Sequence, residues 1–123
     1  MECLRLWIQN KRNTRVHKFV RSFNWRDLRC ELCKSLFDDE FYYKSKKYKL
    51  LEYEEPEHSN YLVLESFTHT FNKTIHILEI PDGMMESFIV GRSSSVSVRI
   101  TDISVSRKHA LISFDSNNFY LKD

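Results

Sequence analysis

The chain has 123 residues but little glycine or proline, with 2 of each. Two glycines are few for a β protein that is rich in turns. Long apolar runs are also lacking, because none approaches the roughly 20 residues of a membrane-spanning helix. The apolar stretch Leu4–Ile8 is short and is interrupted by Arg5, so we expect no signal peptide. We therefore expect a chain without a membrane span, located inside the cell in the cytoplasm or nucleus.

Catalytic motifs are absent as well. The sequence contains no G-x-S-x-G motif, no phosphate-binding P-loop and no Ser-His-Asp arrangement. No catalytic residue is therefore predicted for this chain. Cysteine is scarce, with 3 in all. Inside the cell cysteines stay reduced, so a C-x-x-C pair indicates a metal before a disulfide.

Charge, by contrast, is abundant and unevenly distributed. Residues 1–49 carry 13 Lys and Arg against 6 Asp and Glu, whereas residues 50–123 carry 6 against 11. Halves of opposite sign favour two structural units. The basic half is compatible with binding to nucleic acid or to a membrane surface, but a solvated, lysine-rich surface explains the charge as well. We favour the solvated surface.

The first forty residues contain a short helical pattern and a cysteine pair. Leu4, Trp7 and Ile8 fall at i, i+3 and i+4, which places them on one face of a helix. Cys30 and Cys33 have the C-x-x-C spacing with which two thiolates bind one tetrahedral zinc ion from a tight turn. A complete zinc site takes four ligands, so this signal is incomplete, and the cysteines can equally be ordinary small residues.

The segments Cys3–Ile8 and Arg29–Phe37 resemble the C-terminal part of a RING-CH (RING-variant) zinc module, in which a helix carries a tryptophan and a C-x-x-C pair closes the module. The resemblance implies that Cys3 belongs to one zinc site and that Cys30 and Cys33 belong to another. Both sites lack partners, because the other ligands of the family would precede the first residue. The implied activity is that of a zinc-dependent E3 ubiquitin-protein ligase fragment, with a ubiquitin-conjugating enzyme as its partner.

Residues 41–59 mix charge with aromatic side chains, and we interpret them as a charged connector. Interleaved tyrosine and lysine, as in Tyr42-Tyr43-Lys44, can also stack on single-stranded nucleic acid and neutralise it. No glycine-rich or sheet platform accompanies them, so nucleic acid is not the favoured partner. Pro56 follows two glutamates and marks a turn or linker before the next domain.

From residue 60 onward the sequence predicts short strands and no long helix. Pro81-Asp82-Gly83 is a strong turn signal, because proline presets φ and glycine accepts a positive φ. His69 and His76 match no metal-ligand spacing and are interpreted as ordinary strand or loop residues. The close spacing of the strands indicates an antiparallel sandwich. Strands are expected at residues 61–67, 74–80, 87–90, 96–100, 110–114 and 119–121.

Gly91-Arg92 and Ser106-Arg107-Lys108-His109 stand in the register of a forkhead-associated (FHA) domain, a phosphothreonine-reading β-sandwich, which the second half of the chain resembles. The segment 119–123 is similar to the strand before the family's second recognition loop. The chain ends ahead of that Asn-Gly-Thr-like loop. The resemblance therefore implies about half of the fold, and we expect a fragment or a truncated gene model. One of the serines 93–95 is expected to contact the peptide.

The chemistry of these residues suits a phosphate group. The planar guanidinium of Arg92 can bind a phosphate dianion through two hydrogen bonds and stays charged at every relevant pH. The Ser106 hydroxyl can donate a further charge-assisted hydrogen bond. The resemblance implies that Arg107 touches phosphate or peptide backbone and that His109 braces the loops. Gly91 is expected to permit the tight turn that aims Arg92.

The sequence thus predicts an α+β fold, in which a short helical zinc-module remnant is followed by part of an antiparallel, FHA-like β-sandwich. The expected domains are a RING-CH remnant at 1–40, the connector at 41–59 and a partial FHA domain at 60–123. The predicted function is phosphothreonine-peptide binding in protein–protein signalling. Zinc-dependent ubiquitin ligation is the alternative, and zinc is the one cofactor considered, with incomplete sites.

Overall fold

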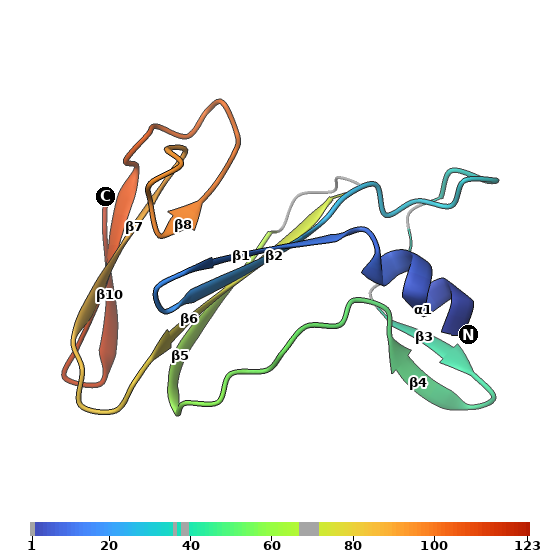
Figure 1. The fold of residues 1–123 in the computed structure, drawn as a ribbon, viewed down its shortest axis with the longest axis horizontal. Helices are drawn as coiled ribbons and strands as arrows, with labels where there is room; N and C mark the ends of the chain where they lie inside the picture. The colour runs from blue at the N-terminus through green and yellow to red at the C-terminus, as the bar shows by residue number, and fades with distance from the viewer. Residues whose placement is uncertain (1, 36, 38–39, 67–71) are drawn as a thin grey trace. The chain divides into compact units, whose positions relative to one another are not determined.

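The structure is a computed structural model that describes residues 2–35, 37, 40–66 and 72–123. Within these residues it is mostly antiparallel β-sheet with little helix (Figure 1). His69 and the end of the predicted strand 61–67 lie outside the described residues. No helix in the described part of the chain has both the length and the apolar character needed to cross a membrane. The elements are α1 (Glu2–Gln9), β1 (Arg12–His17), β2 (Val20–Trp25), β3 (Glu40–Tyr43), β4 (Lys46–Lys49), β5 (Asn60–Glu65), β6 (Lys73–Ile80), β7 (Glu86–Gly91), β8 (Val98–Arg99), β9 (Ala110–Asp115) and β10 (Asn118–Lys122).

The chain groups into two compact units, and each unit is discontinuous in sequence. The first unit comprises Met1–Thr14, Phe23–Glu55 and Glu65–Ile75, and the second comprises Arg15–Ser22, Pro56–Leu64 and His76–Asp123. The division into residues 1–40, 41–59 and 60–123 rests on family resemblance and stays a prediction. Contacts between strands do not reveal from which family a segment derives.

In the first unit, α1 buries the face that its apolar spacing predicts. Ile8 is fully buried, and Trp7 packs against the edge of Phe37 with ring centroids 5.7 Å apart. Trp25 is also fully buried, at 6.2 Å from the ring of Tyr53. Burial of such large rings contributes much of the stability of a small core. Both tryptophans therefore have the packing role that suits their size.

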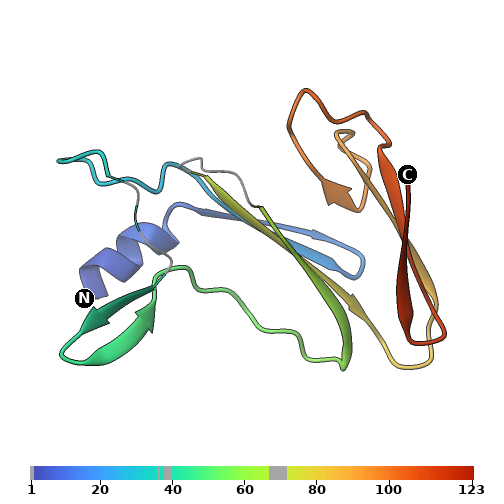
Figure 2. The same ribbon diagram turned by 180° about the vertical axis from the view of Figure 1, so that it is seen from behind.

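Residues 40–49, which lie almost wholly within the predicted connector, form an antiparallel hairpin of β3 and β4 (Figure 2). Its turn residues Lys44 and Ser45 both have positive φ, at 51° and 63°. Positive φ at both central positions is typical of a type I′ turn, which usually carries Asn-Gly or another glycine-containing pair. Lysine and serine give no such signal, and the hairpin was therefore not predicted.

One four-stranded sheet has the order β1-β2-β6-β5. Strands β5 and β6 confirm the predictions at 61–67 and 74–80 over the described residues. Strands β1 and β2 were not predicted, since their charged and polar residues obscure any alternation. In β6 the consecutive residues 75–78 are all buried, so both faces of this central strand are covered.

A buried polar pair lies within this sheet. Ser22 Oγ of β2 is 2.7 Å from His76 Nδ1 of β6, and both side chains are buried. Burial lowers the pKa of His76 from 6.5 to about 4, and the positive charge of Arg15 lowers it further in the same direction. His76 is therefore a neutral core residue at physiological pH, as its interpretation as an ordinary strand histidine requires.

The second four-stranded sheet has the order β10-β9-β7-β8. Strands β7, β9 and β10 confirm three predicted strands, whereas the strand predicted at 96–100 shortens to β8. Strand β8 pairs with β7 in parallel, whereas the other pairs of this sheet are antiparallel, as predicted. Figure 1 shows both connections of β8 at the end of this sheet away from the β9–β10 turn. The hydrophobic core of the second unit is a cluster of buried residues from both sheets. It comprises Val20, Leu78, Ile80, Phe88, Val90, Val98, Ile112 and Phe114.

Candidate functional site

The residues predicted to bind phosphate lie on the two loops that flank β8, the β7–β8 loop (residues 92–97) and the β8–β9 loop (residues 100–109). Backbone hydrogen bonds join these loops. The Arg92 N–H donates to the Ser106 carbonyl at 3.0 Å, and the Ser93 N–H donates to the Arg107 carbonyl at 3.3 Å. The fold therefore brings the Arg92 and Ser106 positions together, although β8 separates them in the sequence.

At Gly91, two backbone segments approach each other closely. It is the last residue of β7, and among the described residues the glycine at positive φ is Gly83 instead. A Cβ atom on Gly91 would lie 2.1 Å from the carbonyl oxygen of Arg107 and 2.7 Å from its carbonyl carbon. That Gly91 permits the tight turn that aims Arg92 stays a prediction. Its missing side chain lets the β8–β9 loop pass directly against the end of β7.

The Arg92 side chain is exposed and held at one point. Its Nε donates to the carbonyl oxygen of Val105 at 3.1 Å. In the described part of the chain, its two terminal nitrogens make no hydrogen bond or ion pair. An arginine anchored through Nε presents the remaining fork of N–H donors to solvent, where it can bind two oxygens of one anion.

Ser106 and His109 form a local hydrogen-bonded pair. The backbone N–H of Ser106 donates to His109 Nδ1 at 3.3 Å, and Ser106 Oγ lies 3.1 Å from the same nitrogen. Because a backbone N–H can only donate, Nδ1 is an acceptor and the ring proton is on Nε2. The Ser106 hydroxyl then also donates to His109. To donate to phosphate, it must first rotate away from that histidine.

Positive charge is concentrated around these loops. Arg99, Arg107 and Lys108 are exposed, and Arg99 Nε approaches the Arg92 carbonyl at 3.4 Å. The acidic residue of the β8–β9 loop is Asp102, whose carboxylate accepts hydrogen bonds from the Ser104 hydroxyl and N–H at 2.7 and 2.8 Å. These bonds hold the pKa of Asp102 below its ordinary value. The cations outnumber this one carboxylate, which favours an anionic ligand.

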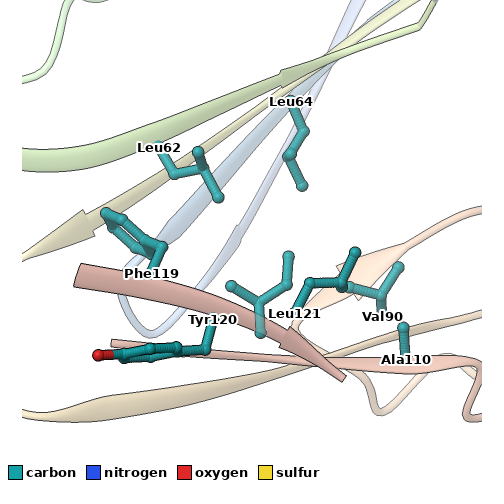
Figure 3. Close-up of a pocket in the computed structure, with 8 residues that line it drawn as sticks. Leu62, Leu64, Val90, Ala110, Phe119, Tyr120 and Leu121 are labelled. Atoms are coloured by element: carbon teal, nitrogen blue, oxygen red, sulfur yellow. The ribbon is translucent and has the colours of Figure 1, made fainter. Parts of the chain in front are cut away.

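Two hollows lie on the second unit. The first has a volume of about 270 Å³, and Figure 3 shows Leu62 and Leu64 facing Phe119 and Leu121 across it. Its lining is apolar and holds no charged side chain, so it cannot bind phosphate. The second, of about 330 Å³, adjoins the candidate site and is lined by Ile89, Lys108, His109, Ala110, Leu111, Lys122 and Asp123.

Cys30 and Cys33 lie on a tight turn in the first unit. The Lys34 N–H donates to the Cys30 carbonyl at 2.9 Å, and the Cys30 N–H donates to the Ser35 carbonyl at 2.8 Å. Hydrogen bonds from the Ser35 side chain, the Ser35 backbone and the Cys30 thiol lower the pKa of Cys33 from 9.0 to about 7. These bonds stabilise a thiolate at one sulfur, which is the form that binds metal.

The two cysteines of this turn are suited to two of the four ligand positions of a tetrahedral zinc site, and the turn supplies no third ligand. Within the described residues, no group of three or more His, Cys, Asp or Glu side chains is placed to hold a metal ion. Cys3 is exposed and belongs to no such group. The described residues thus do not complete the zinc sites that the RING-CH resemblance implies, and zinc binding stays a prediction.

Sequence comparison agrees with the geometry of the loops. Residues 88–123 match the family model of the FHA domain. The matched segment includes residues 88–91 of β7, strands β8 to β10 and both loops of the candidate site. The predicted FHA resemblance is therefore confirmed for this segment. Comparison with curated proteins and with solved structures gives no match.

Sequence reasoning missed one residue that contacts this site. Arg15 of β1 reaches the β7–β8 loop with its guanidinium. It lies far outside the segment that the family model covers. Several arginines surround it in the N-terminal half, and no motif distinguishes it from them.

Proposed function

We propose that the chain binds phosphothreonine-containing segments of other proteins through Arg92, Ser106 and Arg107. FHA domains bind such segments, and residues 88–123 carry the sequence of that family. The observation that carries the proposal is the anchored Arg92 side chain, whose fork of donors is open to solvent beside the Ser106 loop. An intracellular location, in the cytoplasm or nucleus, fits this function and stays a prediction.

Binding would proceed by charge pairing and by one rotation. The Arg92 fork takes two oxygens of the phosphate dianion, and charge-assisted bonds of this kind are about twice as strong as neutral ones. The Ser106 hydroxyl exchanges His109 Nδ1 for a third phosphate oxygen. The Ser106 N–H keeps its bond to His109, so the loop holds its shape during this exchange. The exposed Arg107 adds a further donor to phosphate or to the peptide backbone.

The test is a titration of the chain with a phosphothreonine peptide and with its unphosphorylated twin. We expect binding of the phosphorylated peptide only, and a loss of about 100-fold in affinity on Arg92→Ala, because truncating one partner of a hydrogen-bonded charge pair that the bound peptide buries typically costs about 2–5 kcal/mol. Arg26→Ala is the matched control, since Arg26 is an exposed arginine of the first unit. Equal affinity for the two peptides, or no loss on Arg92→Ala, would refute the proposal.

Zinc-dependent ubiquitin ligation is the alternative, and the cysteine turn is the observation that favours it. Cys30 and Cys33 would hold one zinc ion together with ligands from elsewhere, and Cys3 would belong to a second site. A ubiquitin-conjugating enzyme would then be the partner. Zinc content of the purified chain tests this alternative. Less than one equivalent of zinc per chain contradicts it.

A further inference from the structure

Three carbonyl oxygens of the β7–β8 loop converge on the guanidinium of Arg15. Arg15 Nη1 donates to the Ser97 carbonyl at 3.0 Å, and Nη2 donates to the carbonyls of Val96 at 2.6 Å and Ser94 at 3.2 Å. Three carbonyl dipoles that point at one place repel one another unless a donor lies between them. Arg15 supplies these donors together with a positive charge.

The two ends of this loop are held by different parts of the chain. At the beginning, the N–H groups of Arg92 and Ser93 donate to the β8–β9 loop. At the end, the carbonyls of Ser94, Val96 and Ser97 accept from Arg15. Between these anchors the loop has internal contacts, namely a 3.5 Å bond from the Val96 N–H to the Ser93 carbonyl, a 3.4 Å bond from the Ser95 N–H to the Ser93 hydroxyl and a 3.0 Å contact of the Ser93 and Ser95 hydroxyls.

Loss of the Arg15 contacts would therefore free the end of the loop. Val96 is almost completely buried, so its side chain would still anchor the loop at residue 96. The backbone of residues 94–97 and the hydroxyls of Ser94 and Ser95 would then sample more conformations, whereas the bonds of the Arg92 and Ser93 N–H groups to the β8–β9 loop would remain. A ligand that binds this loop must immobilise it, and ordering of each flexible group costs about 0.5–1.5 kcal/mol of binding free energy.

We infer that Arg15 is a positioning residue of the phosphopeptide site, which pre-organises the β7–β8 loop without touching the ligand. This inference rests on the proposed function. Both terminal nitrogens of Arg15 are engaged by backbone carbonyls, so they do not compete with Arg92 for phosphate. The FHA-like segment alone does not contain this anchor, because the N-terminal strand β1 supplies it.

The test compares two substitutions in the full chain, Arg15→Met and Arg15→Lys. Methionine keeps the length of the side chain without its donors, and lysine keeps the charge and part of the donor capacity. We expect the affinity for a phosphothreonine peptide to fall about tenfold with methionine and about threefold with lysine. The unfolding midpoints should stay near that of the wild-type chain. Amide NMR signals of residues 93–97 should shift or broaden, and those of β9 and β10 should not.

The matched control is Arg12→Met. Arg12 lies on the same strand but donates to the Glu52 carbonyl and to Glu54 in the first unit, so its loss should leave peptide affinity unchanged.

Each outcome of this test either supports or overturns the inference about Arg15. A folded Arg15→Met variant that binds as tightly as the wild-type chain overturns the inference and leaves the proposed function standing. A wild-type chain that fails to bind the phosphopeptide overturns both. Where Arg15→Met does not fold, Arg15→Lys decides alone, and unchanged affinity of that variant overturns the inference.

Discussion

The two candidate ligand sites of this chain are assembled in opposite ways. The cysteine turn is closed by hydrogen bonds within the six consecutive residues Cys30–Ser35. The loops of the candidate phosphate site are joined to each other across β8, and Arg15 contacts one of them from 79 to 82 residues away. One site is local in the sequence, and the other exists only in the folded sheet.

This difference determines how many candidate ligand groups each site contains. A tight turn can present two thiols side by side, but zinc requires four ligands, and the other two must come from elsewhere. The loops combine the Arg92 fork, the Ser106 hydroxyl and several nearby cations, which are the groups that the proposed phosphate site requires. The comparison also implies different sensitivities. The loops depend on backbone fit between distant segments, whereas the turn depends on its immediate neighbours.

The largest expected effect concerns the backbone fit at Gly91. Gly91→Ala should destabilise the chain by about 3 kcal/mol, because a Cβ atom 2.1 Å from the Arg107 carbonyl oxygen forces the two segments apart. Urea denaturation measures this change, and phosphopeptide binding should fall with it. Gly83→Ala is the control, since Gly83 has φ of 78° and an added Cβ would meet no described residue within 4 Å apart from its chain neighbours. It should cost only about 1–2 kcal/mol. A smaller loss for Gly91→Ala than for Gly83→Ala contradicts the close-approach explanation.

Mild acid should lower the free energy of unfolding, because His76 gains a proton when the chain unfolds. The folded-state pKa of His76, about 4, lies below its unfolded value of 6.5, so the unfolded chain binds the proton first. The stability that this histidine contributes is fully present above pH 6.5 and is lost as the pH falls towards 4. At pH 5 the loss is about 2 kcal/mol. His76 belongs to the compact unit that carries the loops of the candidate phosphate site, so phosphopeptide binding should weaken in acid.

The control for this pH dependence is His76→Phe, which removes the titrating group and fills a similar volume. The free energy of unfolding, measured between pH 7 and pH 5, should decline about 2 kcal/mol less in this variant than in the wild-type chain. Parallel curves for the two chains would show that other groups cause the acid sensitivity.

The smallest effect concerns the cysteine turn. Because hydrogen bonds from Ser35 contribute most to the lowered pKa of Cys33, its alkylation by iodoacetamide should rise through a midpoint near pH 7. Ser35→Ala removes the hydroxyl and keeps the backbone donor, so this midpoint should rise by about one pH unit. Ser45→Ala, in the β3–β4 turn, serves as the control. An unchanged midpoint in Ser35→Ala would mean that the thiolate is stabilised by something other than this turn.

Most strands of the C-terminal half could be predicted from the chain alone. Strands β5, β6, β7, β9 and β10 have aliphatic and aromatic residues with turn signals between them, such as Pro81-Asp82-Gly83. That turn forms as predicted, with Gly83 at positive φ and the Met84 N–H bonded to the Pro81 carbonyl. Helix α1 was equally predictable, because its apolar spacing is a property of adjacent residues.

The rest could not be predicted, for identifiable reasons. Strands β1 and β2 carry little apolar alternation, and β1 takes its place through pairing with β2 in the β1-β2-β6-β5 sheet. The β3–β4 hairpin turns at Lys44-Ser45, a pair without a turn signal. Gly91 could be recognised as special, but its contact with the Arg107 carbonyl depends on where the β8–β9 loop passes.

For the candidate site, too, the residue types could be predicted from the sequence, whereas their arrangement in space could not. The residues whose chemistry suits phosphate, Arg92, Ser106 and Arg107, could be predicted because residue types and their spacing are properties of the sequence. Their convergence requires the parallel pairing of β7 with β8 and the backbone bonds between the two loops. The Arg15 anchor depends wholly on the fold, since hydrogen bonds to backbone carbonyls leave no pattern in the residues that accept them.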